Sequence, residues 1–164
     1  MVELNRIREL VERGDVTELA RLLVQAYPQG LVGERDALVT LFMKAGLPHA
    51  EAVRWASELE KEGHAHHLPG ARPRWVFTGK PVSFRRLASL VKSEWGGYVG
   101  DADGATEEAL EFFERRLGVD HNTALEIYRG LEAAGYVSVA FQEGPDHARD
   151  RVLFEFPEVF LKQV

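Results

Sequence analysis

Basic side chains gather near the middle of the chain and have the charge needed to bind a phosphate backbone. Residues 70–95 carry 6 Lys or Arg against 1 acidic residue, whereas residues 1–69 carry 8 against 11 and residues 96–164 carry 6 against 14. Guanidinium and ammonium groups that reach phosphate oxygens position a protein on DNA without reading its sequence. The predicted phosphate contacts are Arg72, Arg74, Lys80, Arg85, Arg86 and Lys92.

A second group of polar side chains lies in the stretch "GVDHNTALEIYRGLEAAGY" (Gly118–Tyr136), which has the pattern of a helix that follows a short glycine-containing turn. Side chains that donate and accept hydrogen bonds from such a helix can reach base edges in the major groove of DNA. The predicted contacts of this helix are His121, Asn122, Thr123 and Arg129.

The residue types exclude much other chemistry. The chain has no cysteine, which excludes disulfides, thiolate metal sites and cysteine nucleophiles. No nucleophile-base-acid set, phosphate loop or paired carboxylates can be read from the sequence, so we expect no enzyme and no cofactor. His64 and His66 of "HAHHL" point the same way on a strand but lack further ligands, so we expect surface histidines and no metal site.

Composition indicates a soluble globular protein of one domain or two small ones, because 45% of the 164 residues are hydrophobic. The apolar runs are too short to span a bilayer, and the N-terminus "MVELNRIREL" lacks the apolar region of a signal peptide. We therefore expect a cytoplasmic protein without membrane contact. Its net charge of −6 argues against coating of a polyanion over the whole surface.

The chain repeats itself. "LARLLVQAY" (Leu19–Tyr27) aligns with "LASLVKSEW" (Leu87–Trp95), and residues 34–64 align with residues 106–136 without a gap. Two copies of one structural unit explain both alignments.

Each repeat has the pattern of three helices followed by a β-hairpin. The first helix is predicted to begin at a hydroxyl cap, Thr17 or Ser83, and the third to end at Gly63 or Gly135. Three helices followed by a hairpin, or wing, make a winged helix. We predict a mainly α fold with small β-hairpin wings (α+β), formed by two tandem winged-helix domains. The boundaries are 1–15 for an N-terminal helix, 16–79 for the first repeat, 80–157 for the second repeat and 158–164 for a C-terminal tail.

At "RRLGVDHNTALEIYRGLEAAGYVSV" (Arg115–Val139) the sequence resembles the winged helix-turn-helix module of GntR-type bacterial transcription regulators. The resemblance implies DNA binding and transcription regulation. At two positions where that family commonly has arginines, this chain has His121 and Leu125, and the first repeat has His49 and Val53.

Two functions follow from these observations. The first is a DNA-binding regulator or accessory factor that uses the basic segment and the wings, with Trp75 and Trp95 as candidate stacking residues. The alternative is a protein-binding adaptor that does not read DNA, similar to the ScpB-type subunits of chromosome-segregation complexes. Its predicted contacts are Val53 and Leu125, since exposed aliphatic patches mark partner surfaces. The partner is thus DNA or a protein, and a homodimer is a further alternative.

Overall fold

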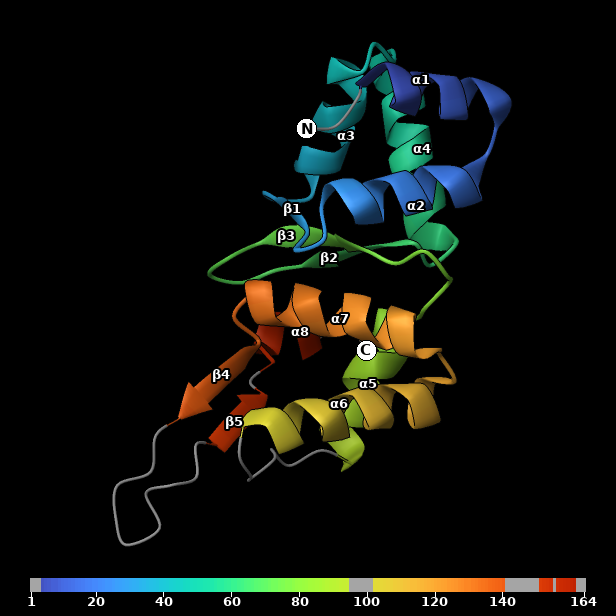
Figure 1. Cartoon of the computed structure of the whole chain (residues 1–164). Coiled ribbons are helices and arrows are strands. Elements are labelled where there is room, and N and C mark those ends of the chain that lie inside the picture. Colours follow the sequence, from blue (N-terminus) through green and yellow to red (C-terminus); the bar gives the residue numbers. More distant parts are fainter. Residues whose placement is uncertain (1–3, 95–101, 141–150, 155, 162–164) are drawn as a thin grey trace, which may run out of the picture.

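The computed structural model describes residues 4–94, 102–140, 151–154 and 156–161. The chain is mainly helical, with one three-stranded and one two-stranded antiparallel sheet, which confirms the α+β prediction (Figure 1). The elements in chain order are α1 (Leu4–Arg13), α2 (Val16–Ala26), β1 (Leu31–Val32), α3 (Asp36–Lys44), α4 (His49–Lys61), β2 (Ala65–Leu68), β3 (Arg74–Phe77), α5 (Phe84–Glu94), α6 (Ala102–Leu117), α7 (His121–Ala133), β4 (Val137–Ala140), β5 (Arg151–Phe154) and α8 (Glu158–Leu161).

Helices and strands recur at the spacing that the sequence repeat predicts. Helices α4 and α7 have 13 residues each and begin 72 positions apart (121 − 49), and β2 and β4 also begin 72 positions apart (137 − 65). Helices α2 and α5 have 11 residues each and begin 68 positions apart (84 − 16). Gly63 and Gly135 follow α4 and α7 with φ of 82° and 83°, a left-handed conformation that ends a helix without steric cost.

The first helix of each repeat is capped differently. Ser83 Oγ accepts from the backbone amide of Arg86 at 3.2 Å, which confirms the predicted hydroxyl cap of α5. The Thr17 prediction is wrong. Helix α2 begins one residue earlier, and Asp15 Oδ1 accepts from the amide of Glu18 at 3.1 Å, because an aspartate at this position is at least as good a cap as a hydroxyl.

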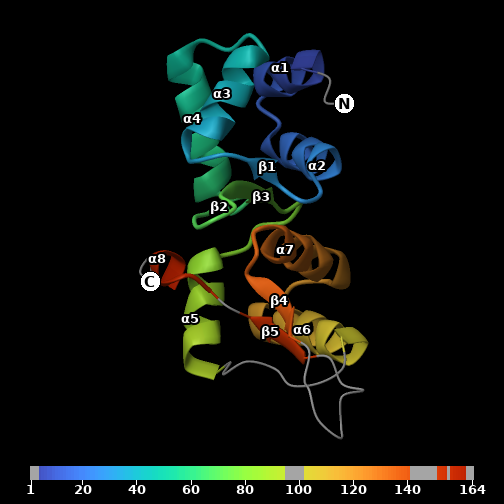
Figure 2. The same cartoon turned by 90° about the vertical axis from the view of Figure 1, so that its left-hand side faces the viewer.

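The three-stranded sheet has the order β1-β3-β2 and lies between two layers of helices (Figures 1 and 2). Along β3, successive side chains point to opposite faces. Trp75 and Phe77 belong to a core shared with α1 to α4, whereas Val76 belongs to a second core with α5 to α8. On β2, Leu68 joins that second core. One hairpin therefore contributes to both cores.

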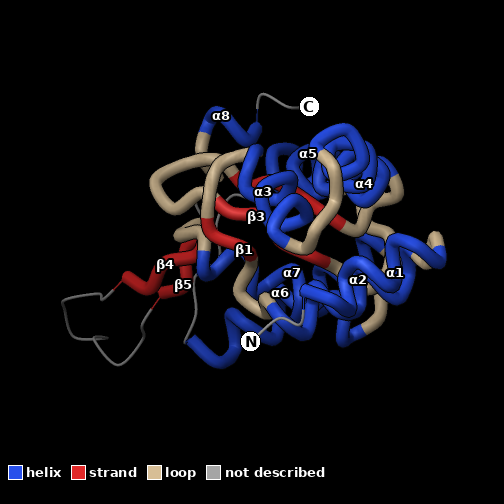
Figure 3. Tube along the Cα trace, turned by 90° about the horizontal axis from the view of Figure 1, so that it is seen from above, coloured by secondary structure: helices blue, strands red, loops and turns tan. Residues whose placement is uncertain are grey.

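The two-stranded sheet lies to one side of the three-stranded sheet (Figure 3). Strands β4 and β5 pair antiparallel, with Val137 opposite Phe154, as predicted for the second hairpin. The predicted loop of that hairpin, residues 143–150, lies outside the described residues. The predicted C-terminal tail begins with α8, whose Phe160 is 1% exposed and packs near Tyr136, so this segment is part of the second core.

Candidate functional site

Helix α7, the third helix of the second repeat, packs against strand β3 of the first repeat (Figures 1 and 2). Gly130 makes the approach close: a Cβ atom added there would stand 2.4 Å from Cγ1 of Val76. Another face of α7 is buried in the second core through Ala124, Ile127 and Leu131. Two of its faces are thus occupied within the chain.

Polar contacts hold α7 to the segment that joins the two repeats, residues 79 and 80. The carboxylate of Glu126 accepts a hydrogen bond from the backbone amide of Gly79 at 3.0 Å, and partial burial raises the pKa of Glu126. The ammonium group of Lys80 pairs with Asp120, the N-cap of α7, and this hydrogen bond lowers the pKa of Asp120. Asp120 also accepts from the amide of Thr123 at 2.8 Å. Lys80, a predicted phosphate contact, therefore neutralises a carboxylate of its own repeat.

Of the four predicted base-contacting residues of α7, three are exposed and one is buried. Thr123 is 2% exposed and unable to reach a ligand. Asn122 and Arg129 are exposed, and Leu125 between them is half-buried against the second core. His121 is also exposed, with Nδ1 3.5 Å from Oε1 of Glu114. The open strip of α7 consequently offers one guanidinium group.

Some side chains of the basic segment, residues 70–95, are also held by contacts within the chain. Arg74 Nη1 donates to the carbonyl of Gln29 at 3.0 Å and its Nε to the carbonyl of Arg72 at 3.2 Å. Arg86 Nη2 donates to the carbonyl of Arg116 at 3.1 Å. These two guanidinium groups thus bond to the chain itself.

Arg72 and Arg85 are exposed, but strand β3 lies between them in the sequence. Four strand residues span about 13 Å. Arg72 lines a hollow with Gly135 and Pro157, whereas Arg85 lines a different one with Gly63. The structure does not bring these two side chains together. Lys92 lies in α5, and its side chain is outside the described part of the chain.

Helix α4, the third helix of the first repeat, has an open face. Val53 is 40% exposed, and His49 is exposed as well. The charges on this side of the helix are mixed, since the exposed Glu51 lies near the exposed Arg54 along the chain. Such a face has no excess of positive charge for a phosphate backbone.

The hairpin histidines are buried, so the expectation of surface histidines is wrong. His64 Nδ1 lies 3.0 Å from the carbonyl of Thr78, and His66 Nε2 lies 3.0 Å from the hydroxyl oxygen of Thr78. That hydroxyl donates to the carbonyl of Gly63 at 3.1 Å, so His66 Nε2 is the donor. His66 stacks on Phe84 with ring centroids 3.9 Å apart. Burial lowers the pKa of His66 to about 3, which keeps the ring neutral.

His67 supplies a hydrogen bond that the backbone cannot make beside β1. Gly33 pairs with Pro73 through the Gly33 amide and the Pro73 carbonyl at 3.0 Å, but proline has no N–H to return the bond. His67 Nε2 lies 3.2 Å from the Gly33 carbonyl and supplies the missing donor. Its ring also packs edge-on against Trp75. Trp75 is 2% exposed, so the expectation that it stacks on bases is wrong.

The signal for this burial is present in the sequence. Trp75, Val76 and Phe77 are three consecutive large apolar residues, whereas a strand with one wet face alternates apolar and polar residues. The pattern thus indicates a strand covered on both faces. Trp95, the other stacking candidate, lies outside the described residues.

Comparison of the chain with models of known protein families, with curated proteins and with solved structures finds no match. Among the helices of the described ranges, none has the length and apolar character needed to cross a membrane. Within the same ranges, no three His, Asp or Glu side chains lie close enough together to hold a metal ion.

Proposed function

We propose that the chain is a non-enzymatic, cytoplasmic tandem winged-helix protein that acts as a protein-binding adaptor. The winged-helix assignment of the first repeat is supported by the element order α2-β1-α3-α4-β2-β3 and the sheet order β1-β3-β2. The second repeat is supported by the recurrence of α5, α6, α7, β4 and β5 at the corresponding positions.

One observation carries the adaptor function: the helix that would enter the major groove, α7, is packed on β3 instead. A helix enters the groove with one exposed face of polar and basic side chains. In α7 that face is reduced to a strip containing Asn122, Leu125 and Arg129. Freeing the helix would break the Gly130–Val76 contact and expose the second core.

DNA binding through the basic segment is the competing function, and a titration distinguishes the two. Each phosphate contact adds about 0.9 to the slope of log K against log salt. If all six predicted side chains contact phosphates, raising the salt from 50 to 200 mM would weaken DNA binding about 10³-fold. If only Arg72 and Arg85 do so, the same rise in salt would weaken it about tenfold.

The experiment is a fluorescence-anisotropy titration of a labelled 30-base-pair duplex at 50, 100 and 200 mM salt, with the double reversal Arg72→Glu/Arg85→Glu in parallel. We expect the chain to bind the duplex weakly at most, with the roughly tenfold salt dependence of two phosphate contacts. A steep dependence that the double reversal abolishes would overturn the adaptor function in favour of DNA binding. Positive support would be a stoichiometric complex with a protein from the source cells that survives nuclease treatment and re-forms from the purified components.

A further inference from the structure

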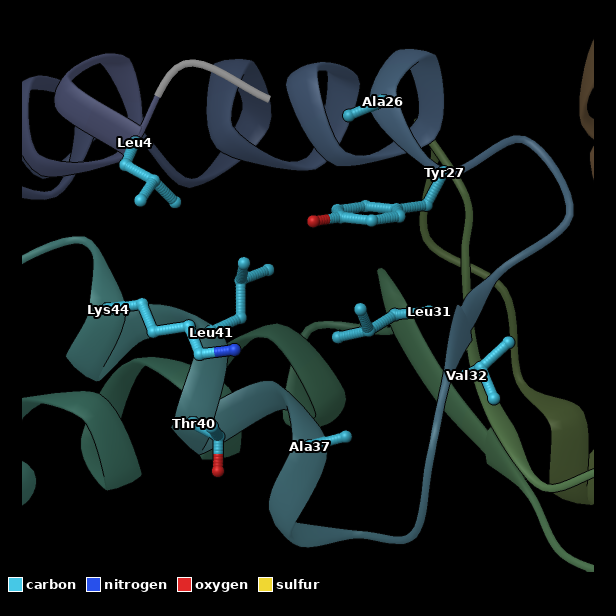
Figure 4. A pocket seen from close by; sticks show the side chains of 9 residues that line it. All are labelled: Leu4, Ala26, Tyr27, Leu31, Val32, Ala37, Thr40, Leu41 and Lys44. Carbon is cyan, nitrogen blue, oxygen red and sulfur yellow. The ribbon is translucent and has the colours of Figure 1, made fainter. Parts of the chain in front are cut away.

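A groove runs along the outer edge of the three-stranded sheet, between α2, β1 and α3 (Figure 4). Its volume is about 580 Å³, within the range of ligand sites in proteins. The lining residues are Leu4, Ala26, Tyr27, Leu31, Val32, Ala37, Thr40, Leu41 and Lys44. Most of these side chains are apolar, so the groove has the walls of a binding site for an apolar ligand surface.

The groove exists because the sheet stops at β1. With the order β1-β3-β2, strand β1 pairs with β3 on one side and with no other described strand on its outer side. Leu31 packs against the first core, and Val32, on the opposite face, is 68% exposed. A fourth strand would cover this edge and place alternate side chains beside Leu31 and Tyr27.

The backbone of Val32 faces the open edge. In an antiparallel pair, residues that exchange hydrogen bonds alternate with residues that do not. Gly33 donates to Pro73, and the register places Leu31 opposite Trp75 and Val32 opposite Arg74. Leu31 and Gly33 therefore point their backbone groups toward β3, and the N–H and C=O of Val32 point away from it.

Two hydrogen-bond donors point into the groove. Figure 4 shows the hydroxyl of Tyr27 and the ammonium group of Lys44 directed toward its centre. Neither has a hydrogen-bond or ion-pair partner within the described ranges, and Lys44 is the one charged side chain among the nine that line the groove. Burial raises the pKa of Tyr27, so the phenol stays protonated and remains a donor. The groove thus lacks an acceptor, and a carboxylate would supply one.

We propose that this groove binds an extended peptide of a partner protein, which adds a strand to the free edge of β1 and carries apolar side chains and one acidic side chain that reaches Lys44 and Tyr27. This proposal rests on the adaptor function and names the chemistry of its partner. Strand addition to a sheet edge is an established mode of peptide recognition, in which backbone bonds give affinity and pockets give specificity. A second copy of the chain that pairs through its own β1 is the competing occupant, and the oligomeric state tests it.

The test is a selection of phage-displayed random twelve-residue peptides on the full chain, followed by anisotropy titrations of the enriched peptides. We expect enrichment of sequences that alternate apolar residues and contain Asp or Glu. On the Lys44→Glu variant, the same library should yield Lys or Arg in place of the acid. The proposal would be overturned if neither the parent chain nor the Lys44→Glu variant enriches any peptide, or if both enrich the same acidic peptides.

Val32→Pro separates strand addition from simple apolar contact. Proline removes only the N–H that points away from β3, so the three-stranded sheet keeps its internal bonds. We expect at least a tenfold loss of peptide affinity, while Val32→Thr, which retains the N–H, binds nearly as well as the parent chain. Circular dichroism checks that both variants fold. Equal binding by both would mean that no strand is added and would overturn the proposal.

The oligomeric state gives the remaining outcome. Analytical ultracentrifugation of the peptide-free chain should show a monomer. A dimer that Val32→Pro dissociates would show that a second copy, and not a peptide, occupies the edge of β1, and would overturn the proposal. The two proposals fail separately. If the chain selects peptides but also binds DNA with a steep salt dependence, the adaptor function is overturned and the peptide groove stands. If the chain selects no peptides and binds no DNA, only the peptide groove is overturned.

Discussion

The backbone of Gly130 in α7 lies directly against the side chain of Val76 in β3. A Cβ atom at Gly130 would stand 2.4 and 2.6 Å from the two γ-carbons of Val76 and 3.1 Å from its Cβ, so no methyl group fits there. Val76 is 2% exposed and β-branched, and it has little freedom to move aside. The two repeats are therefore held at the distance that a glycine in α7 permits.

Gly130→Ala should destabilise the fold although alanine is the better helix former. Overpacking of a core costs about 1–3 kcal/mol, against a gain of about 1 kcal/mol from helix propensity. Urea denaturation measures the difference in the free energy of unfolding. In a Val76→Ala background the two γ-carbons are absent and only the Cβ at 3.1 Å remains, so the same Gly130→Ala change should cost less. A substitution that stabilises in both backgrounds would show that the helix does not lie against the strand at this position.

Tyr136→Phe should cost about 1 kcal/mol, the net value of a typical hydrogen bond. The Tyr136 hydroxyl donates to the carbonyl of Pro69 at 2.6 Å and so ties the second repeat to the turn between β2 and β3. Tyr27→Phe is the matched control, because the Tyr27 hydroxyl has no partner in the described chain and its loss should change the free energy of unfolding little. Equal effects of both substitutions would contradict the assignment.

His67→Phe should cost about 1–2 kcal/mol, because the carbonyl of Gly33 loses its donor while the ring contact with Trp75 is kept. Pro73→Ala supplies a backbone N–H opposite that carbonyl. In the Pro73→Ala background, His67→Phe should therefore cost less than in the parent chain. A thermal denaturation double-mutant cycle measures this coupling, and additive effects would show that His67 does not act through the Gly33 carbonyl.

Stability should fall at mildly acidic pH because of His66. The folded chain holds His66 neutral down to about pH 3, whereas the unfolded chain protonates it near the ordinary histidine pKa of 6.5. The unfolded state thus binds more protons between these values, so stability is fully present above pH 6.5 and is lost as the pH falls. The loss at pH 5 amounts to about 2 kcal/mol.

Urea denaturation at pH 7 and pH 5 measures this loss. His66→Gln, which can still donate to Thr78, should reduce the difference by about 2 kcal/mol. His49→Gln changes an exposed histidine and should leave the difference as it is in the parent chain. If His66→Gln retains the full pH dependence, another group is responsible.

The sequence predicts the repeated elements well because their signals are local. Helical periodicity and a glycine that must adopt positive φ, such as Gly63 or Gly135, depend only on neighbouring residues. The Thr17 cap failed because Asp15 offered an equivalent oxygen two residues earlier. Local patterns place an element correctly and its end within one or two residues.

The candidate site was harder to predict because it depends on contacts between residues far apart in the sequence. The basic segment is a fact of sequence, yet Lys80 pairs with Asp120 and Arg86 with the carbonyl of Arg116, contacts between residues 40 and 30 positions apart. Periodicity carries no information on such pairing. The apolar run from Trp75 to Phe77 indicates that β3 is covered on both faces, but it does not show that α7 covers the face of Val76.

Successive side chains of β3 pack into different cores, and this determines how the chain can unfold. A fragment that ends at residue 79 would leave Leu68 and Val76, now 0% and 2% exposed, open to water, and burial of each contributes roughly 1.5–3 kcal/mol. A fragment that begins at residue 80 would lack the strand on which α7 rests. Two copies of one unit have thus become a single cooperative folding unit, and its loss of structure is expected to be all-or-none.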